Sequence, residues 1–215
     1  MKMAKGISKH KKAFTLVELL VALTVSAIVL GAVASIAYAM GSADVSGSDI
    51  SEKQAQVRYA TVRITELIKH SRLMCAGFPL SLAFWSGDTN GNGKINPGEL
   101  VYMETDSGRG YLMLCEFSAV SPAAEKEITI AEIQSGAAKT WLLSNCQPNY
   151  TVLISQGSNV TFLSDQAGPY TRLVAVSFDI AEDGVSRTYQ IAAAIRCAAF
   201  NLLDAGGQIA VSDDD

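Results

Sequence analysis

FTLVELLVALTVSAIVLGAVASIAYAM, residues 14–40, is the stretch of this 215-residue chain that decides its fold, and Glu18 is its only charged residue. A helix of this length measures about 40 Å and exceeds the roughly 30 Å core of a bilayer. Its many Leu and Ala residues favour helix, and no Pro interrupts it. Because every face of such a helix is apolar, the stretch predicts a membrane-spanning helix rather than one buried in a soluble core.

Residues 1–13 form a basic leader with five Lys, one His and no acidic residue. Positive flanks stay on the cytoplasmic side, so the residues after 40 are predicted to lie outside the inner (cytoplasmic) membrane. A cleavable secretory signal is the alternative, and Ala37-Tyr38-Ala39 fits a site for its peptidase. The apolar run exceeds a signal core of about 7–15 residues and contains a carboxylate, which favours the membrane helix.

The composition and charge of the chain exclude several classes of protein. Hydrophobic residues make up 49% of the chain and charged residues 18%, which excludes a disordered protein. Beyond the leader the chain carries 12 basic and 21 acidic side chains, a net charge of −9 that excludes the usual nucleic-acid-binding protein. His70 is the only histidine after the leader, and no nucleophile, phosphate-loop or HExxH motif occurs, so we predict that the chain is not an enzyme.

The residues around the start of the apolar run, Lys12-Ala13-Phe14-Thr15-Leu16-Val17-Glu18-Leu19-Leu20, resemble the processing signature of type IV prepilins and of the pseudopilins of type II secretion. Members have a short basic leader, a small residue at the cut, and then Phe, Thr, Leu, a β-branched residue, Glu and Leu. The resemblance implies that a prepilin peptidase cuts between Ala13 and Phe14 and methylates the new amine. It also implies that Glu18 pairs with the Phe14 amine of a neighbouring subunit, since a carboxylate at membrane depth needs a fixed partner.

The polar, glycine- and serine-containing residues 41–48 predict a hinge or an unwound turn. Residues 49–215 are then expected to hold a continuation of the helix and a β-rich globular domain. Asp49 and Ser51 both have capping-box spacing, and apolar residues follow a helical period to about Met74. We therefore expect a second helical segment that lays one apolar stripe on a sheet.

Beyond Gly77 the pattern is typical of strands. They are expected at 80–85, 100–105, 111–117, 150–155, 160–163, 171–181 and 186–198, with short helical turns between 123 and 144. Asp183-Gly184 predicts a tight turn between the last two strands. The order predicts an α+β, pilin-like fold in which a long N-terminal helix, membrane-spanning in its first half, packs on an antiparallel β-sheet.

Residues 88–99, DTNGNGKINPGE, match the EF-hand loop template at every specified position. The expected calcium ligands are the side-chain oxygens of Asp88, Asn90 and Asn92, the backbone carbonyl of Lys94, Asn96 through a water, and both carboxylate oxygens of Glu99. Because the flanking residues read as strands, the loop would join strands rather than move helices. With two charged ligands, an affinity of about 10⁻⁴–10⁻³ M is expected. The alternative is a surface turn without metal.

Four cysteines, Cys75, Cys115, Cys146 and Cys197, fall in the domain predicted to lie outside the cytoplasm, where disulfides can form. They allow three connectivities, between which spacing does not choose. Buried free thiols are the alternative. Their wide spacing, without a CxxC pair, argues against a zinc site.

The resemblance implies a structural subunit of a type IV pilus or a type II secretion pseudopilus, with its rank as a major or minor subunit left open. Its partners would be other pilin or pseudopilin subunits and a prepilin peptidase, and the inner membrane would hold it before assembly. The alternative is a secreted or membrane-anchored calcium-binding adhesion module that does not polymerise. A mature chain starting at Phe14 supports the first function, and one starting at Met40 supports the second.

Overall fold

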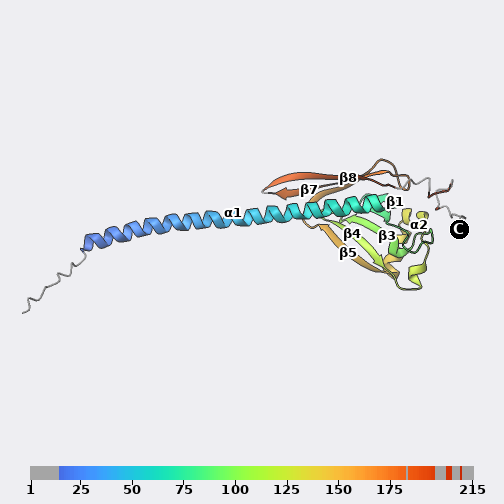
Figure 1. Cartoon of the computed structure of the whole chain (residues 1–215), viewed down its shortest axis with the longest axis horizontal. Helices are drawn as coiled ribbons and strands as arrows, with labels where there is room; N and C mark the ends of the chain where they lie inside the picture. Colours follow the sequence, from blue (N-terminus) through green and yellow to red (C-terminus); the bar gives the residue numbers. More distant parts are fainter. Residues whose placement is uncertain (1–14, 183, 197–201, 205–208, 210–215) are drawn as a thin grey trace, which may run out of the picture. The chain divides into compact units, whose positions relative to one another are not determined.

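The computed structural model describes residues 15–182, 184–196, 202–204 and 209, with no side chains for residues 42–48. It divides into two compact units, Met1–Asp49 and Ile50–Asp215. One helix, α1 (Leu16–His70), belongs to both units, and all the strands belong to the second (Figure 1).

Helix α1 ends at His70, four residues before the predicted end at Met74. The backbone N–H of Ser71 still donates to the Leu67 carbonyl at 2.9 Å, and the chain then enters strand β1 (Leu73–Phe78). The apolar residues of β1 continue the helical stripe in the sequence, but pairing with β2 decides their conformation. Sheet pairing thus overrides local propensity at this boundary.

The backbone of residues 41–48 is helical, so the predicted unwound turn is wrong. The segment contains no Pro, the one residue that would remove a helical hydrogen bond. Gly41 and Gly47 each cost about 1 kcal/mol relative to Ala, while propagation between two helical neighbours adds one bond per residue. The boundary between the two units follows directly, after Asp49.

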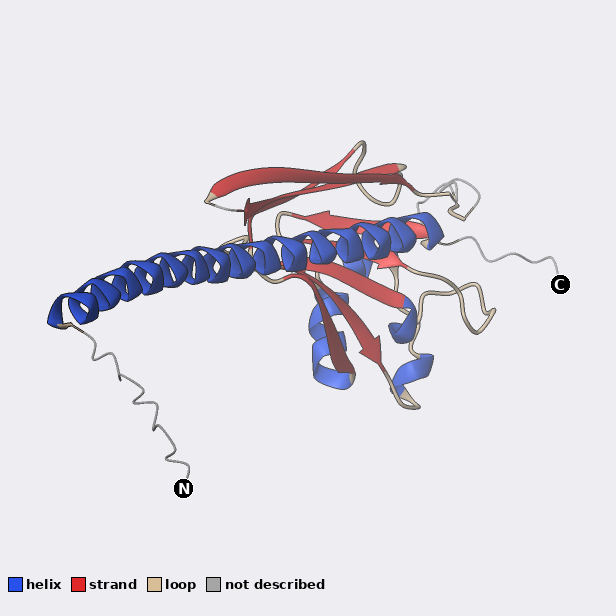
Figure 2. Cartoon of the chain, turned by 60° about the vertical axis from the view of Figure 1, so that its left-hand side comes forward, coloured by secondary structure: helices blue, strands red, loops and turns tan. Residues whose placement is uncertain are grey.

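The second unit contains two antiparallel sheets (Figure 2). The first has the order β1-β2-β3-β4-β5, in which neighbours in sequence are neighbours in space; its further strands are β2 (Ser81–Trp85), β3 (Leu100–Thr105), β4 (Leu112–Ser118) and β5 (Gln147–Ile154). The second has the order β6 (Gly157–Ser164), β7 (Leu173–Glu182) and β8 (Val185–Ala194). Short helices lie between the strands: η1 (Pro97–Glu99), η2 (Ala123–Glu125), α2 (Ile130–Gln134) and α3 (Ala137–Asn145).

Most strand predictions are close to the structure, and β3 has the predicted bounds. Strand β1 was not predicted, and β5 begins at Gln147 rather than at Tyr150. The predicted turn after β7 is present, because Glu182 pairs with Val185 and Gly184 has a φ of +76°. The fold class is confirmed: a long N-terminal helix is followed by antiparallel sheets in an α+β arrangement.

Two apolar cores hold the second unit together. In the first, buried residues of α1 (Ala60, Ile64 and Ile68) pack with one face of the five-stranded sheet and with the three-stranded sheet. In the second, the other face of the five-stranded sheet packs with α2, α3 and Ile95. Both faces of the larger sheet are therefore covered, which explains why β2 and β3 are buried at every residue.

Candidate functional site

The first turn of α1 holds Glu18 in a reciprocal pair of bonds with Thr15. The backbone N–H and the hydroxyl of Thr15 both donate to Glu18 Oε2 at 3.0 Å, and the Glu18 N–H donates to Thr15 Oγ1 at 3.2 Å. This is a capping box, a second role that the Thr-x-x-Glu spacing would have revealed. The predicted processing residues, Ala13 and Phe14, lie outside the described residues.

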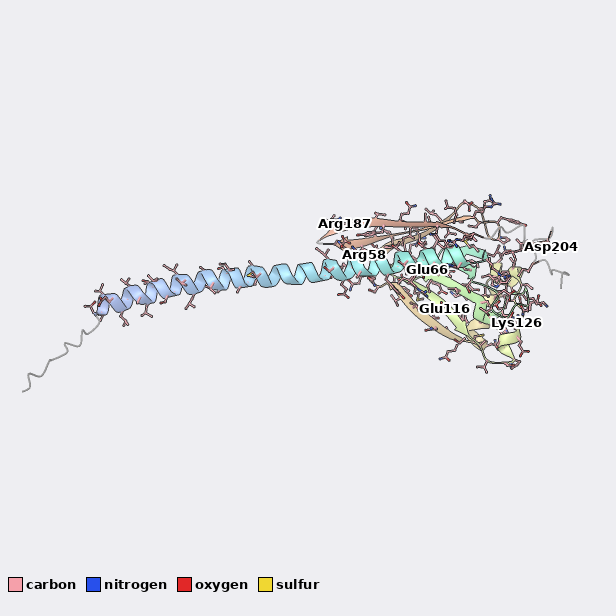
Figure 3. All side chains as sticks on the ribbon, viewed as in Figure 1. Arg58, Glu66, Glu116, Lys126, Arg187 and Asp204 are labelled. Carbon is pink, nitrogen blue, oxygen red and sulfur yellow. The ribbon has the colours of Figure 1, made fainter. Side chains whose placement is uncertain are left out.

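Beyond Glu18, helix α1 is apolar on all sides up to Gly41. The segment Leu16–Gly41 is long and apolar enough to cross a membrane, with a mean hydropathy of 2.5. Each of its Leu, Ile, Val, Met and Tyr side chains is 53–81% exposed. The labelled charged side chains of Figure 3 all belong to the second unit. Such a surface is stable only against lipid or against other apolar helices.

The loop of residues 88–99 connects β2 to β3 and turns through Gly91 and Gly93, whose φ angles are +72° and +71°. Glycine adopts this left-handed conformation without strain, which is why position six of the template requires it. The Asp88 carboxylate accepts the backbone N–H groups of Asn92 (3.1 Å) and Gly93 (2.9 Å). Asp88, the first predicted ligand, thus holds the turn in place through hydrogen bonds to its backbone.

The three asparagines of the loop meet at Asn96. The Nδ2 atoms of Asn90 and Asn92 both donate to Asn96 Oδ1, at 2.9 and 2.8 Å. Asn90 Oδ1 and Asn92 Oδ1 accept the N–H groups of Asn92 and Lys94 at 3.0 and 2.8 Å. Local side-chain bonds therefore gather these predicted ligands into one loop.

Glu99 closes the loop from within the core, where it is 1% exposed. Its carboxylate accepts the Thr89 N–H at 2.7 Å, the Asn96 N–H at 3.2 Å and the Trp85 indole Nε1–H at 3.2 Å. The EF-hand template does not give Thr89 or Trp85 as a bonding partner of Glu99. These bonds satisfy a buried carboxylate that would otherwise be costly, and they tie the last loop position to the second.

The surroundings fix the loop to the domain. Ile95 is fully buried, and its carbonyl accepts the Ile128 N–H at 2.8 Å. The Arg72 guanidinium lies 3.5 Å from the Asp88 carboxylate, and Lys94 Nζ lies 2.7 Å from Glu127. The second half of the loop is therefore packed into the domain, while residues 89–92 are exposed.

The donor set of this loop fits a hard cation. Its side-chain ligands offer oxygen atoms only, and calcium takes about six to eight oxygens from carboxylates, amides, carbonyls and water. Among the described residues, no group of three or more His, Cys, Asp or Glu side chains could hold a metal ion. The loop contributes two such residues, so amide and backbone oxygens would have to supply the rest of the shell.

The thiols of Cys75, Cys115 and Cys146 are free. Cys75 lies on β1 and Cys115 on β4, three strand positions apart, which is about 14 Å and too far for a disulfide. Both are buried, and burial raises the pKa of Cys75 to about 12 and that of Cys115 to about 11. Among the described residues these cysteines form no disulfide with one another. Cys197 lies outside the described residues.

Comparison with known families gives one finding. Residues 8–34 match the prokaryotic N-terminal methylation motif. The match contains the predicted cut after Ala13, together with Glu18 and most of the apolar segment. It supports a type IV pilin-like protein, and it agrees with a helix able to anchor the chain in a membrane. Comparison with curated proteins and with solved structures gave no match.

Proposed function

We propose that the chain is a structural subunit of a type IV pilus or of a type II secretion pseudopilus, assembled through the first half of α1. One observation carries the proposal: the methylation motif at residues 8–34 covers the start of a helix whose large apolar side chains from Leu16 to Met40 are all more than half exposed. Soluble monomers rarely expose such a large apolar surface to water. Lipid before assembly and neighbouring helices after it would both cover the apolar side chains.

Glu18 would set the register of assembly. Before assembly the bonds from Thr15 hold its carboxylate in the first turn. A prepilin peptidase would expose the Phe14 amine of each subunit, which offers a cation next to this carboxylate in a neighbour. An ion pair in an apolar bundle overcomes its desolvation cost only when the two groups are fixed in place, so a mismatched register would leave a buried charge unpaired.

Calcium would stabilise the domain outside the membrane. The support is the full match of residues 88–99 to the loop template, the convergence of Asp88, Asn90, Asn92 and Asn96, and the fixed position of Glu99. Because the loop joins two central strands, a bound ion would restrain the β2–β3 pair and would not move a helix.

Mass spectrometry of the mature N-terminus tests the assembly function directly. A chain that starts at N-methylated Phe14 is expected. A chain that starts at Met40, after removal of the apolar segment, would refute assembly and indicate the secreted adhesion module instead.

Glu18→Gln tests the register role, because it removes the charge and keeps the shape of the side chain. The variant should insert into the membrane in normal amounts but should be lost from sheared filaments on immunoblots. Ser26→Ala, a conservative change in the same exposed apolar segment, is the matched control and should assemble normally. Normal filament incorporation of Glu18→Gln would overturn the register role.

A further inference from the structure

A cavity of about 710 Å³ lies in the second unit, between edge strand β1 and the residues that follow β6. It belongs neither to the loop of residues 88–99 nor to the first half of α1. Its apolar lining residues include Met74, Phe78, Leu82 and Phe162. Its polar lining residues, here called the polar wall, are Gln134, Ser164, Asp165 and Gln166.

Close backbone contacts fix the walls of this cavity. A Cβ on Gly168 would lie 2.7 Å from the Met74 carbonyl oxygen and 2.8 Å from that of Cys75, so glycine is required where this segment meets β1. Gln134 Nε2 bridges the same two segments, donating to the Gly168 carbonyl at 3.1 Å and to the Cys75 carbonyl at 3.4 Å. The cavity is therefore preformed, as small-ligand sites usually are.

The polar wall keeps hydrogen-bonding capacity. Asp165 Oδ1 accepts the N–H groups of Arg172 (2.9 Å) and Leu173 (3.0 Å), which orients the carboxylate and leaves Oδ2 available. Gln134 uses its Nε2 for the bridge and keeps its Oε1. The Gln166 side chain bonds to no described residue and can both donate and accept. Among the described lining residues, Asp165 is the only charged one.

We propose that this cavity binds the terminal neutral sugar of a glycan. A sugar hydroxyl both donates and accepts, which matches a wall holding a carboxylate oxygen and two amides. The C–H face of a sugar ring is apolar and would rest on Phe162, which lines the cavity and packs against the same core as Met74 and Leu82. An anionic ligand would face the Asp165 carboxylate without a compensating cation among the described lining residues.

A cationic ligand is disfavoured by the same wall. Asp165 already accepts two backbone N–H groups and is exposed to solvent, so its attraction for a cation is weakened. An ammonium group can donate to the amide oxygens, but it has no acceptor for the amide N–H groups of Gln166. The inference does not depend on the assembly function, because the cavity lies wholly within the second unit.

The experiment uses the full-length protein in lauryldimethylamine oxide, a detergent without a sugar headgroup. The probes are the methyl glycosides of glucose, galactose, mannose and N-acetylglucosamine, with n-butylamine as the cationic probe. Saturation-transfer NMR detects binding and a titration measures it. At least one glycoside is expected to bind, with its ring C–H protons receiving the most saturation.

Three variants test whether the ligand binds in this cavity. Gln166→Ala and Asp165→Asn should each weaken binding about three- to ten-fold, the effect of one lost hydrogen bond. Phe162→Leu keeps apolar volume but removes the ring, and should weaken binding similarly. Leu163→Ala is the matched control: it lies next to Phe162 on β6, is 55% exposed and does not line the cavity, and it should leave binding unchanged.

The outcomes separate the alternatives. Binding of no glycoside, or of n-butylamine alone, would overturn the proposal, and so would glycoside binding that survives all three variants. Near-ultraviolet circular dichroism of each variant checks that the domain remains folded. Because Gln166 is exposed and makes no side-chain bond to a described residue, its substitution by Ala keeps the test valid even where the other variants lose stability.

Discussion

Calcium should raise the melting temperature of the full-length protein by a calculable amount. At a dissociation constant of about 10⁻⁴–10⁻³ M, as expected for a loop with two charged ligands, 2 mM calcium stabilises the folded state by about 0.7–1.8 kcal/mol. For a unit of the size of residues 50–215, 1 kcal/mol corresponds to about 2–4 °C. We therefore expect a shift of about 1–7 °C, reversed by chelation.

The bonds inside the loop decide which variant tests this. Glu99→Ala is a poor choice, because it would leave the buried Trp85 indole N–H without its acceptor and destabilise the fold even without metal. Asp88→Asn removes one of the two negative ligands and keeps one side-chain oxygen, so it retains one of the two bonds that Oδ1 and Oδ2 of Asp88 accept from the N–H groups of Asn92 and Gly93. The relevant quantity is the increment that calcium adds in each variant, not the melting temperature itself.

Asp106→Asn is the matched control for Asp88→Asn. Asp106 likewise accepts backbone N–H groups in a turn, from Gly108 and Gly110, but it lies outside residues 88–99. Differential scanning fluorimetry with 2 mM calcium, with 2 mM magnesium and with chelator measures the increments. Calcium should stabilise the wild type and Asp106→Asn equally, and Asp88→Asn much less. An absent shift in the wild type, or an equal shift in Asp88→Asn, would refute the calcium assignment.

Three further predictions concern the second unit. Iodoacetamide at pH 8 should label Cys146 before Cys75, whose thiol is buried with a pKa of about 12; labelling of Cys75 in the folded protein, followed by mass spectrometry, would contradict its burial. Ile64→Ala should cost about 2–5 kcal/mol in urea unfolding, whereas Val62→Ala, 54% exposed on the same helix, should stay within about 0.5 kcal/mol; similar losses would place the core elsewhere. Bonds from backbone N–H groups, chiefly that of Gly110, lower the pKa of Asp106 below its ordinary 3.8, so its stabilisation is present above that value and is lost as pH falls through the lower folded value. The melting temperature should therefore fall less steeply below pH 4 in Asp106→Asn than in the wild type, and identical slopes would count against this contribution.

Local chemistry explains why much of the fold could be predicted. The capping box at Thr129 and Glu132 forms as its spacing indicates, and it begins α2. Gly184 makes the two-residue connection between β7 and β8 for the reason the Asp-Gly pair predicts. In both places the signal and the structure lie within four residues of each other.

Pairing over longer distances explains the misses. The residues of β1 read equally well as the end of a helix, and their strand conformation depends on partners in β2. Only residues 155 and 156 separate β5 from β6, a spacing typical of a hairpin, yet the two strands belong to different sheets. The Gly157 N–H donates instead to the Gly110 carbonyl at 2.9 Å, because β6 carries Val160 and Phe162 to the core around α1.

The same division applies to the candidate sites. The template found the loop of residues 88–99 because its ligands are neighbours in sequence, but the Trp85 bond to Glu99 depends on two strands being paired. The thiols remained ambiguous for a similar reason. Spacing in sequence does not reveal that β2 and β3 separate Cys75 from Cys115.

The hydrophobic residues of the chain include two separate sets, one exposed along the first half of α1 and one buried in the two cores of the second unit. The apolar residues buried in the two cores begin at Ala60, whereas the large apolar residues up to Met40 are all more than half exposed. Since the two sets belong to different compact units, changes in them should have additive effects. A substitution before residue 41 should therefore alter membrane insertion or assembly without altering calcium or glycoside binding. A substitution such as Ile64→Ala should lower the stability of the second unit, and with it calcium or glycoside binding, without altering membrane insertion or assembly unless it unfolds the domain.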